Sequence, residues 1–236
     1  MREISWTKNL AILERCRDYQ EREFYIRRTQ QFGWSKNVLI HQIENRTYEK
    51  TRLNQTSFDN ALPPEIRDQA KLAVKDEYTF DFLELADEHS ERQLEQSILT
   101  KVEPFLLEMG GMFSFIGSQY RLEVAGKEYF IDLLLFHRRL RSLVAVELKI
   151  GEFQPEQIGK MQFYLAVLDD TARIAGENPA IGILICKSKD RTIVEYALKD
   201  SSKPIGVATY RIVSTVPDEL QDDLPSPDAI ARLIRD

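Results

Sequence analysis

The N-terminal part of the chain carries apolar residues at helical spacing, separated by charged positions. Residues 6–16 and 18–32 both show this spacing, which predicts two amphipathic helices. Gly33 ends the second helix, and Ser35 stands where an N-cap is expected before another apolar run. Two helices joined by a short glycine-containing turn are typical of a helix-turn-helix, with residues 35–45 as the candidate recognition helix. An ordinary helical hairpin with a solvated polar face explains the same pattern.

The next stretch is less regular, and then a clear helix signal returns. Pro63-Pro64 marks a turn before a short helical pattern over 65–75. We interpret the acidic stretch 76–88 as a connector. Its aromatic residues are expected to pack against the following domain. A capping box of Ser90 and Gln93 begins the next predicted helix. That helix ends at Gly110-Gly111, and Pro104 is expected to kink or split it.

From residue 119 onward, the apolar period changes from that of a helix to that of a strand. Strands are predicted at 119–124, 128–137, 142–150, 181–187 and 205–212, and helices at 155–168 and 191–198. A three-stranded meander followed by crossover helices implies a mixed sheet covered by helices, which is an α/β domain. The predicted organisation is a helical N-terminal domain (1–58), a connector (59–88), the α/β domain (89–213) and an acidic tail (214–236) with a short helix at 229–235.

Composition narrows the class of protein. The chain has 236 residues, of which 43% are hydrophobic and 30% are charged, so it resembles neither a disordered nor a membrane protein. It has no run of 18 apolar residues and no apolar block at its N-terminus, and we therefore expect a cytoplasmic protein without a membrane partner. Two cysteines without a CxxC pattern argue against a disulfide scaffold or a zinc finger.

The charge distribution is uneven along the chain. The net charge is −6, which by itself argues against a nucleic-acid partner. Residues 1–52, however, have a balance of +4, whereas the remaining residues have −10. A basic head on an acidic body indicates a partner-binding segment at the N-terminus.

Three charged residues interrupt apolar strands where burial is expected. Asp132 lies within one predicted strand, and Glu147 and Lys149 lie on one face of the next. Buried charges are costly unless they pair or bind a metal, so a buried Asp/Glu–Lys ion pair is one explanation. The other is a Mg²⁺ site of two carboxylates and the Leu148 carbonyl, with Lys149 beside the attacking water. An Asp followed fifteen residues later by Glu-x-Lys is the sequence mark of the PD-(D/E)XK phosphodiesterases.

The helix before the meander commonly supplies a further glutamate in that group of enzymes. Glu95 is the best candidate for this position, because it lies on the same flank as the apolar residues of its helix. Glu91 and Glu103 compete for the role, and any of the three side chains could be solvated.

Several longer runs resemble the YhcG-type family of PD-(D/E)XK nucleases. The resemblance rests on Gly117–Val124, Tyr129–Leu134, His137–Leu140, Val146–Phe153, Gly159–Leu165, Ile183–Lys187, Glu195–Leu198 and Pro204–Val207, and on Ser5-Trp6 and Gly33-Trp34-Ser35 near the N-terminus. It implies a restriction-endonuclease-like core, DNA hydrolysis with Mg²⁺ or Mn²⁺, and an N-terminal module that binds DNA or a protein partner.

The resemblance also assigns roles to individual residues. It implies that Asp132, Glu147 and Lys149 are catalytic, with Glu95 as the helix acid. Tyr164 follows Lys160 by four residues, where RecB-type relatives have a Gln-x-x-x-Tyr motif. Lys160 departs from that motif, so we expect it to contact phosphate. A core tyrosine with a satisfied hydroxyl is an equally good explanation of Tyr164.

Basic residues indicate where DNA would lie. The expected phosphate contacts are Lys36, Arg46, Arg138, Arg139, Arg141 and Lys160. The polar positions of the candidate recognition helix are Lys36, Asn37, His41, Gln42 and Arg46. Three arginines in a turn also keep a hairpin soluble, and His137 beside them is expected to be structural.

The predicted function is therefore a DNA endonuclease that depends on a divalent metal. A homodimer would cut both strands, because one such site cuts one strand. The alternative is a catalytically silent DNA-binding or complex-assembly module built on a nuclease-like fold. RNA and branched DNA stay open as substrates.

Overall fold

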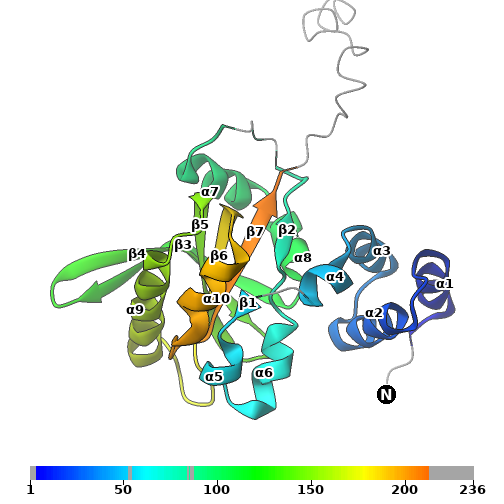
Figure 1. The fold of residues 1–236 in the computed structure, drawn as a ribbon, viewed down its shortest axis with the longest axis horizontal. Coiled ribbons are helices and arrows are strands. Elements are labelled where there is room, and N and C mark those ends of the chain that lie inside the picture. The colour runs from blue at the N-terminus through cyan, green and yellow to red at the C-terminus, as the bar shows by residue number, and fades with distance from the viewer. Residues whose placement is uncertain (1–3, 53–54, 84, 86–87, 213–236) are drawn as a thin grey trace, which may run out of the picture.

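The computed structural model describes residues 4–52, 55–83, 85 and 88–212. An α/β body built on one sheet has a group of helices at its side (Figure 1). This confirms the predicted mixed α/β class with a helical N-terminal region. Among the described helices, none has the length and apolar composition to cross a membrane. The acidic tail (214–236) and the helix predicted at 229–235 lie outside the described residues.

The N-terminal helices begin and end at the predicted caps. They are α1 (Trp6–Arg15), α2 (Tyr19–Phe32), α3 (Lys36–Glu44) and α4 (Thr47–Arg52). Gly33 follows α2 with a φ of +66°, which favours glycine because a Cβ is disfavoured there. The Ser35 hydroxyl accepts a hydrogen bond from the Val38 amide at 3.2 Å and so caps α3. Buried Ile12, Tyr25 and Leu39 form a small core shared by these helices.

The meander and its crossovers follow the predicted order. The strands are β1 (Gln55–Thr56), β2 (Glu77–Thr79), β3 (Phe113–Val124), β4 (Lys127–His137), β5 (Ser142–Glu152), β6 (Ile181–Ser188) and β7 (Ile205–Arg211). In the described part of the chain, the sheet order is β1-β7-β6-β5-β4-β3, and β2 also pairs with β7. β3, β4 and β5 are antiparallel, whereas β5, β6 and β7 are parallel and connected by α9 (Glu156–Thr171) and α10 (Arg191–Lys199).

Helices cover both faces of the sheet. One face packs on α5 (Phe58–Ala61), α6 (Pro64–Lys71), α7 (Glu91–Thr100) and α8 (Val102–Met109). The opposite face packs on α9 and α10. Successive strand residues point to opposite faces, so Val144 joins the first core and Ala145 the second. Burial on both faces explains why β5 is almost continuously apolar, and why the charge of Glu147 within it needs an explanation.

Several segments differ from the pattern-based prediction: α4, β1 and α5 were not predicted, and β3 begins at Phe113 instead of residue 119. Part of the segment expected to be a connector (76–88) is β2, which pairs with β7, and Tyr78 and Phe80 beside it are fully buried. A strand of three residues is too short for alternation to reveal it. The helix predicted from Ser90 to Gly110 is split into α7 and α8 as expected, but the break lies at Lys101 and Pro104 stands in the first turn of α8.

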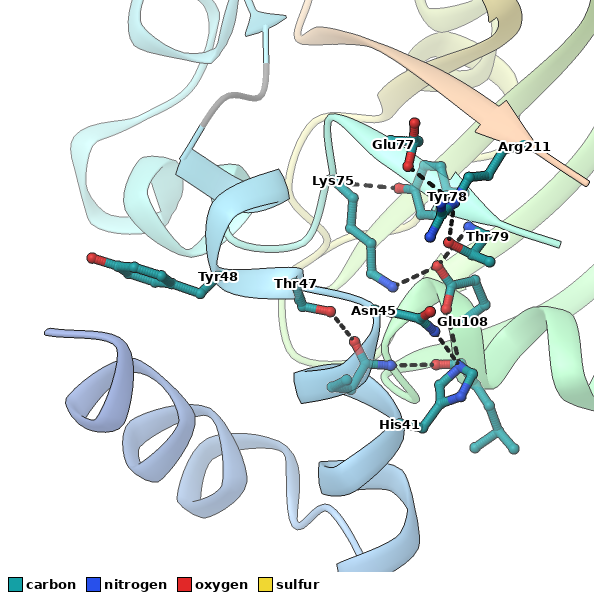
Figure 2. A network of polar contacts seen from close by, with 12 residues as sticks. His41, Asn45, Thr47, Tyr48, Lys75, Glu77, Tyr78, Thr79, Glu108 and Arg211 are labelled. Carbon is teal, nitrogen blue, oxygen red and sulfur yellow. Dashed lines mark hydrogen bonds and ion pairs between the residues drawn. The ribbon is translucent and has the colours of Figure 1, made fainter. Parts of the chain in front are cut away.

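The N-terminal helices dock on α8 through polar contacts (Figure 2). The Gln42 amide donates to the Leu107 carbonyl at 3.3 Å, and His41 Nε2 lies 3.3 Å from a carboxylate oxygen of Glu108. The Trp34 indole donates to the Gly110 carbonyl at 3.4 Å. The third helix is therefore attached to the α/β body by the face that was expected to be a polar recognition surface.

Candidate active site

Two acidic residues lie where strands β4 and β5 stop pairing. The ladder between these strands ends at the pair Leu133 and Val146, and Asp132 and Glu147 are the next residues. An Asp132 carboxylate oxygen accepts a hydrogen bond from the Leu148 amide at 2.8 Å. Glu147 Oε1 accepts one from the Asp132 amide at 3.4 Å. Each acid thus takes a backbone donor of the other strand, which holds the two carboxylates side by side.

Glu147 is the most buried acid of the site, with 1% of its surface exposed. Burial raises the pKa of its carboxyl, and the charge of Asp132 raises it further. The ammonium of Lys160 opposes this shift, because its Nζ lies 2.8 Å from Glu147 Oε2. The buried carboxylate therefore has one close cationic partner, which comes from α9.

Lys149 reaches a different acid. Its Nζ lies 3.0 Å from an oxygen of Glu91 on α7 and 3.9 Å from Glu147 Oε2. Glu91 is exposed, whereas the Lys149 side chain is 18% exposed. Lys149 thus lies at the border between the buried carboxylate and solvent, which is the placement expected of a group that orients water.

Glu95 and Gln119 complete the site from α7 and β3. Glu95 is 7% exposed, and the Gln119 amide donates to Glu95 Oε2 at 2.7 Å and to Asp132 at 3.4 Å. Burial raises the pKa of Glu95, and the charge of Asp132 adds to the effect. Glu91, Glu95, Gln119 and Asp132 line a cleft of about 430 Å³.

Gln119 was not identified as a site residue from the sequence. Its φ of +45° lies in the left-handed region, which is disfavoured for residues other than glycine. Gln119 lies between the ladder pairs Ser118–Leu133 and Tyr120–Ile131, shortly after the register of β3 with β4 shifts between Phe115 and Gly117. Neither the register shift nor the direction of the Gln119 side chain has a signal in a single sequence. Glu91, by contrast, precedes Glu95 by one helical turn and was named as a competitor for its role.

Tyr164 has the placement of a core tyrosine, which is one of the two explanations that the sequence left open. It is 2% exposed and belongs to the core between α9 and the sheet. Burial raises the pKa of its hydroxyl. The ammonium of Lys160 lies 5.1 Å from the centre of its ring, within the range of a cation–π contact. The ring of Tyr164 therefore packs against the ammonium of Lys160, and Lys160 in turn contacts Glu147.

The donor chemistry of the site fits a hard divalent cation. Mg²⁺ and Mn²⁺ prefer carboxylate and carbonyl oxygens, which Asp132, Glu147, Glu95 and the Leu148 backbone provide. Glu95 Oε1 is buried without a hydrogen-bond partner among the described residues. However, no group of three His, Cys, Asp or Glu side chains within those residues is close enough to hold a metal ion. The Gln119 amide and the Lys160 ammonium hold the carboxylate oxygens instead.

The structure does not bring the other basic residues to the acids. Arg138, Arg139 and Arg141 are exposed in the turn between β4 and β5, at least six residues along either strand from Asp132 and Glu147, on the order of 20 Å away. Lys36 and Arg46 are exposed at the two ends of α3. His137 is buried, and its Nδ1 accepts from the Leu140 amide at 3.0 Å, as expected of a structural histidine.

The candidate recognition helix needs a correction. Gln42 is fully buried against α8, so its side chain is not available to read DNA, whereas His41 faces Glu108 and keeps 40% of its side chain exposed. Lys36 and Asn37 stay exposed at the start of α3. The helical pattern identified the element, but a single sequence does not reveal which polar face a neighbouring helix covers.

The comparisons with known proteins agree with this geometry. A family model described as the YhcG PDDEXK nuclease domain matches residues 71–225, and one described as the DUF1016 N-terminal domain matches residues 1–50. The chain belongs to the YhcG PDDEXK nuclease family. Asp132, Glu147 and Lys149 all lie within the matched nuclease domain.

Similar proteins are found in two further comparisons. Over 214 residues the chain is 35% identical to the Escherichia coli (strain K12) protein named "Putative nuclease YhcG"; the match covers 89% of this chain and 56% of that protein. The chain thus spans about half the length of this curated YhcG relative. Among solved structures, a repair endonuclease from Pyrococcus abyssi matches with 18% identity and a TM-score of 0.34, covering 56% of this chain and 50% of that one. An EndoMS–dsDNA2 complex matches with 16% identity and a TM-score of 0.36, covering 58% and 49%.

Proposed function

We propose that the protein is a DNA endonuclease that depends on Mg²⁺ or Mn²⁺. The observation that carries this proposal is the meeting of Asp132 and Glu147 where β4 and β5 separate, with Lys149 at the solvent border beside them. Membership of the YhcG nuclease family supports the same chemistry. Asp132 lines the same cleft as Glu95 and Gln119, which would give a phosphodiester access to this carboxylate.

Each residue has a distinct task in this proposal. Asp132, Glu147 and the Leu148 carbonyl would hold the metal, and Glu95 would hold it directly or through water. When bound, the ion would activate water and neutralise charge on the phosphate. Lys149 orients the attacking water and offsets the negative charge that develops on the phosphate, and Tyr164 supports Lys160 from the core. Two subunits, each with one site, would cut both strands of a duplex.

The second candidate function is a DNA-binding or assembly module without catalysis. It is favoured by the ion pairs of Lys160 with Glu147 and of Lys149 with Glu91, which satisfy the charges without a metal. A metal-independent gel shift without cleavage at any metal concentration would favour this alternative.

The experiment that tests the endonuclease compares the purified protein with D132N and K149M on supercoiled plasmid. We expect nicking with Mg²⁺ or Mn²⁺, none with EDTA, and at least about a hundredfold loss in each variant. The matched control is K127M, which removes a lysine charge at the exposed β3–β4 turn. Cleavage that survives both site variants would come from a contaminant and would contradict the proposed site. Parallel assays on RNA and on branched DNA define the substrate.

A further inference from the structure

The carboxylate of Glu147 already has a cation against it. Lys160 Nζ lies 2.8 Å from Oε2 of Glu147, and this contact joins α9 to β5. Lys149, the other lysine near the same oxygen, is 3.9 Å away and closer to Glu91. Burial lowers the pKa of Lys160, but the hydrogen bond and the charge of Glu147 outweigh this effect and raise the pKa above its ordinary value.

The two partners differ in their freedom to move. Glu147 is 1% exposed and lies on the central sheet, whereas the Lys160 side chain is 46% exposed. The neighbours Met161 and Tyr164 are buried and fix the backbone of α9 against the sheet. A lysine ammonium on a flexible four-carbon stem can therefore leave Glu147 without any change in the backbone.

We propose that Lys160 is an internal cation that occupies the Glu147 end of the metal site and is displaced when a divalent ion binds. This inference rests on the proposed function and assigns Lys160 a role beyond a static phosphate contact. Two cations at one carboxylate repel each other, so metal binding and the Lys160–Glu147 contact exclude each other. The displaced ammonium stays within a side-chain length of the metal, where it contacts a phosphate oxygen of the bound nucleic acid.

Removal of the Lys160 charge should therefore strengthen metal binding. We would titrate MnCl₂ and MgCl₂ into the protein without nucleic acid and measure the heat of binding. K160M is expected to bind at least about threefold more tightly than the unsubstituted protein, because the competing cation is gone. K160R keeps the charge and is expected to bind as the unsubstituted protein does. K127M, an equal loss of charge at the exposed β3–β4 turn, corrects for the net charge.

The same titration separates failure of this inference from failure of the metal site. D132N is expected to bind no metal. If neither the unsubstituted protein nor K160M bound metal, the metal site itself would be wrong, and the role of Lys160 with it. If the unsubstituted protein bound metal and K160M bound it equally or more weakly, the site would stand, and only the displacement of Lys160 would be overturned.

A second readout tests where the ammonium goes. In the K149M background, which we expect not to cleave, binding of a short fluorescent duplex is measured by anisotropy with Mg²⁺ and with EDTA. The K149M/K160M double variant should bind about tenfold more weakly than K149M with Mg²⁺ and equally with EDTA. An equal loss under both conditions would show that Lys160 contacts phosphate without being displaced, which would contradict the proposal.

Discussion

The ammonium of Lys75 lies 2.8 Å from Oε1 of Glu108, and the two side chains are only 5% and 1% exposed. The same oxygen accepts a hydrogen bond from the Thr79 amide at 2.9 Å, and the other oxygen lies 3.3 Å from His41 (Figure 2). Burial alone would raise the pKa of Glu108, but Lys75 and the three hydrogen bonds lower it to about 2. One carboxylate thus ties together α8, the segment before β2 and the N-terminal helix α3.

Loss of the charge on Glu108 should destabilise the whole protein. E108Q keeps the shape of the side chain but leaves the Lys75 ammonium buried without its counter-charge, at a cost of about 3–5 kcal/mol. The free energy of unfolding from urea titrations measures this cost. E103Q, an exposed glutamate on the same helix, should change it by less than about 0.5 kcal/mol. Equal stability of the two variants would contradict a structural role for the ion pair.

The same carboxylate predicts a specific acid sensitivity. The folded-state pKa of Glu108 is about 2, below the ordinary value of 4.5 that the unfolded chain retains. The unfolded chain therefore takes up the proton first, so the stabilisation is complete above pH 4.5 and is lost as the pH falls toward 2. Thermal unfolding between pH 7 and pH 3 should show a smaller loss of Tm below pH 4.5 in E108Q than in the unsubstituted protein. Parallel curves would rule this linkage out.

Gln119 should align Glu95 and Asp132 for catalysis at a cost in stability, because its backbone is strained. Q119A removes the side-chain amide that bridges Glu95 and Asp132, but its alanine still has the unfavourable φ of +45°. Q119G removes the same amide and also relieves the backbone strain. Q119G should be more stable than Q119A by about 1 kcal/mol, since glycine tolerates this backbone region. Both should nick plasmid about tenfold more slowly. Rates that follow stability would show that Gln119 only supports the fold.

Close packing of α9 on β6 predicts the effect of a small substitution. A Cβ at Gly182 would lie 2.5 Å from Met161 Cγ and 2.7 Å from its sulfur. We expect G182A to cost about 1–3 kcal/mol, because the added methyl overpacks the core. In the M161A background the added methyl has room. There, G182A should lower the free energy of unfolding by less, or should raise it. Thermal unfolding of the four proteins in this cycle measures the coupling, and additive effects would contradict the contact.

The exposed residues of α3 should bind DNA, whereas the docked ones should not. K36E/R46E reverses two exposed charges and should weaken duplex binding about tenfold at 0.1 M salt, with a shallower salt dependence. H41A should leave DNA affinity unchanged and lower the stability, because His41 contacts Glu108. Anisotropy titrations at several salt concentrations measure the first effect and urea titrations the second. Unchanged affinity in K36E/R46E would favour a protein-binding role for the N-terminal helices.

Local rules were sufficient for the longer helices and strands and for the choice of the acids. Periodicity, the Ser35 cap and the capping box of Ser90 and Gln93 act within a few residues, so a single sequence contains their signals. Charged residues inside apolar strands are conspicuous because burial makes them costly, and this identified Asp132 and Glu147.

The partners of those charges were decided only in the folded molecule. Lys160 reaches Glu147 because α9 crosses the sheet above β5, and Gln119 reaches Glu95 through a left-handed backbone residue. The burial of Gln42 on α8 and the pairing of β2 with β7 likewise join residues far apart in the chain. Such contacts depend on how the elements pack against one another. Periodicity and residue spacing along one chain contain no information about this packing. The sequence by itself therefore determined the longer elements and the choice of the acids. The tertiary structure decided the short strands and which cations and amides hold the acids.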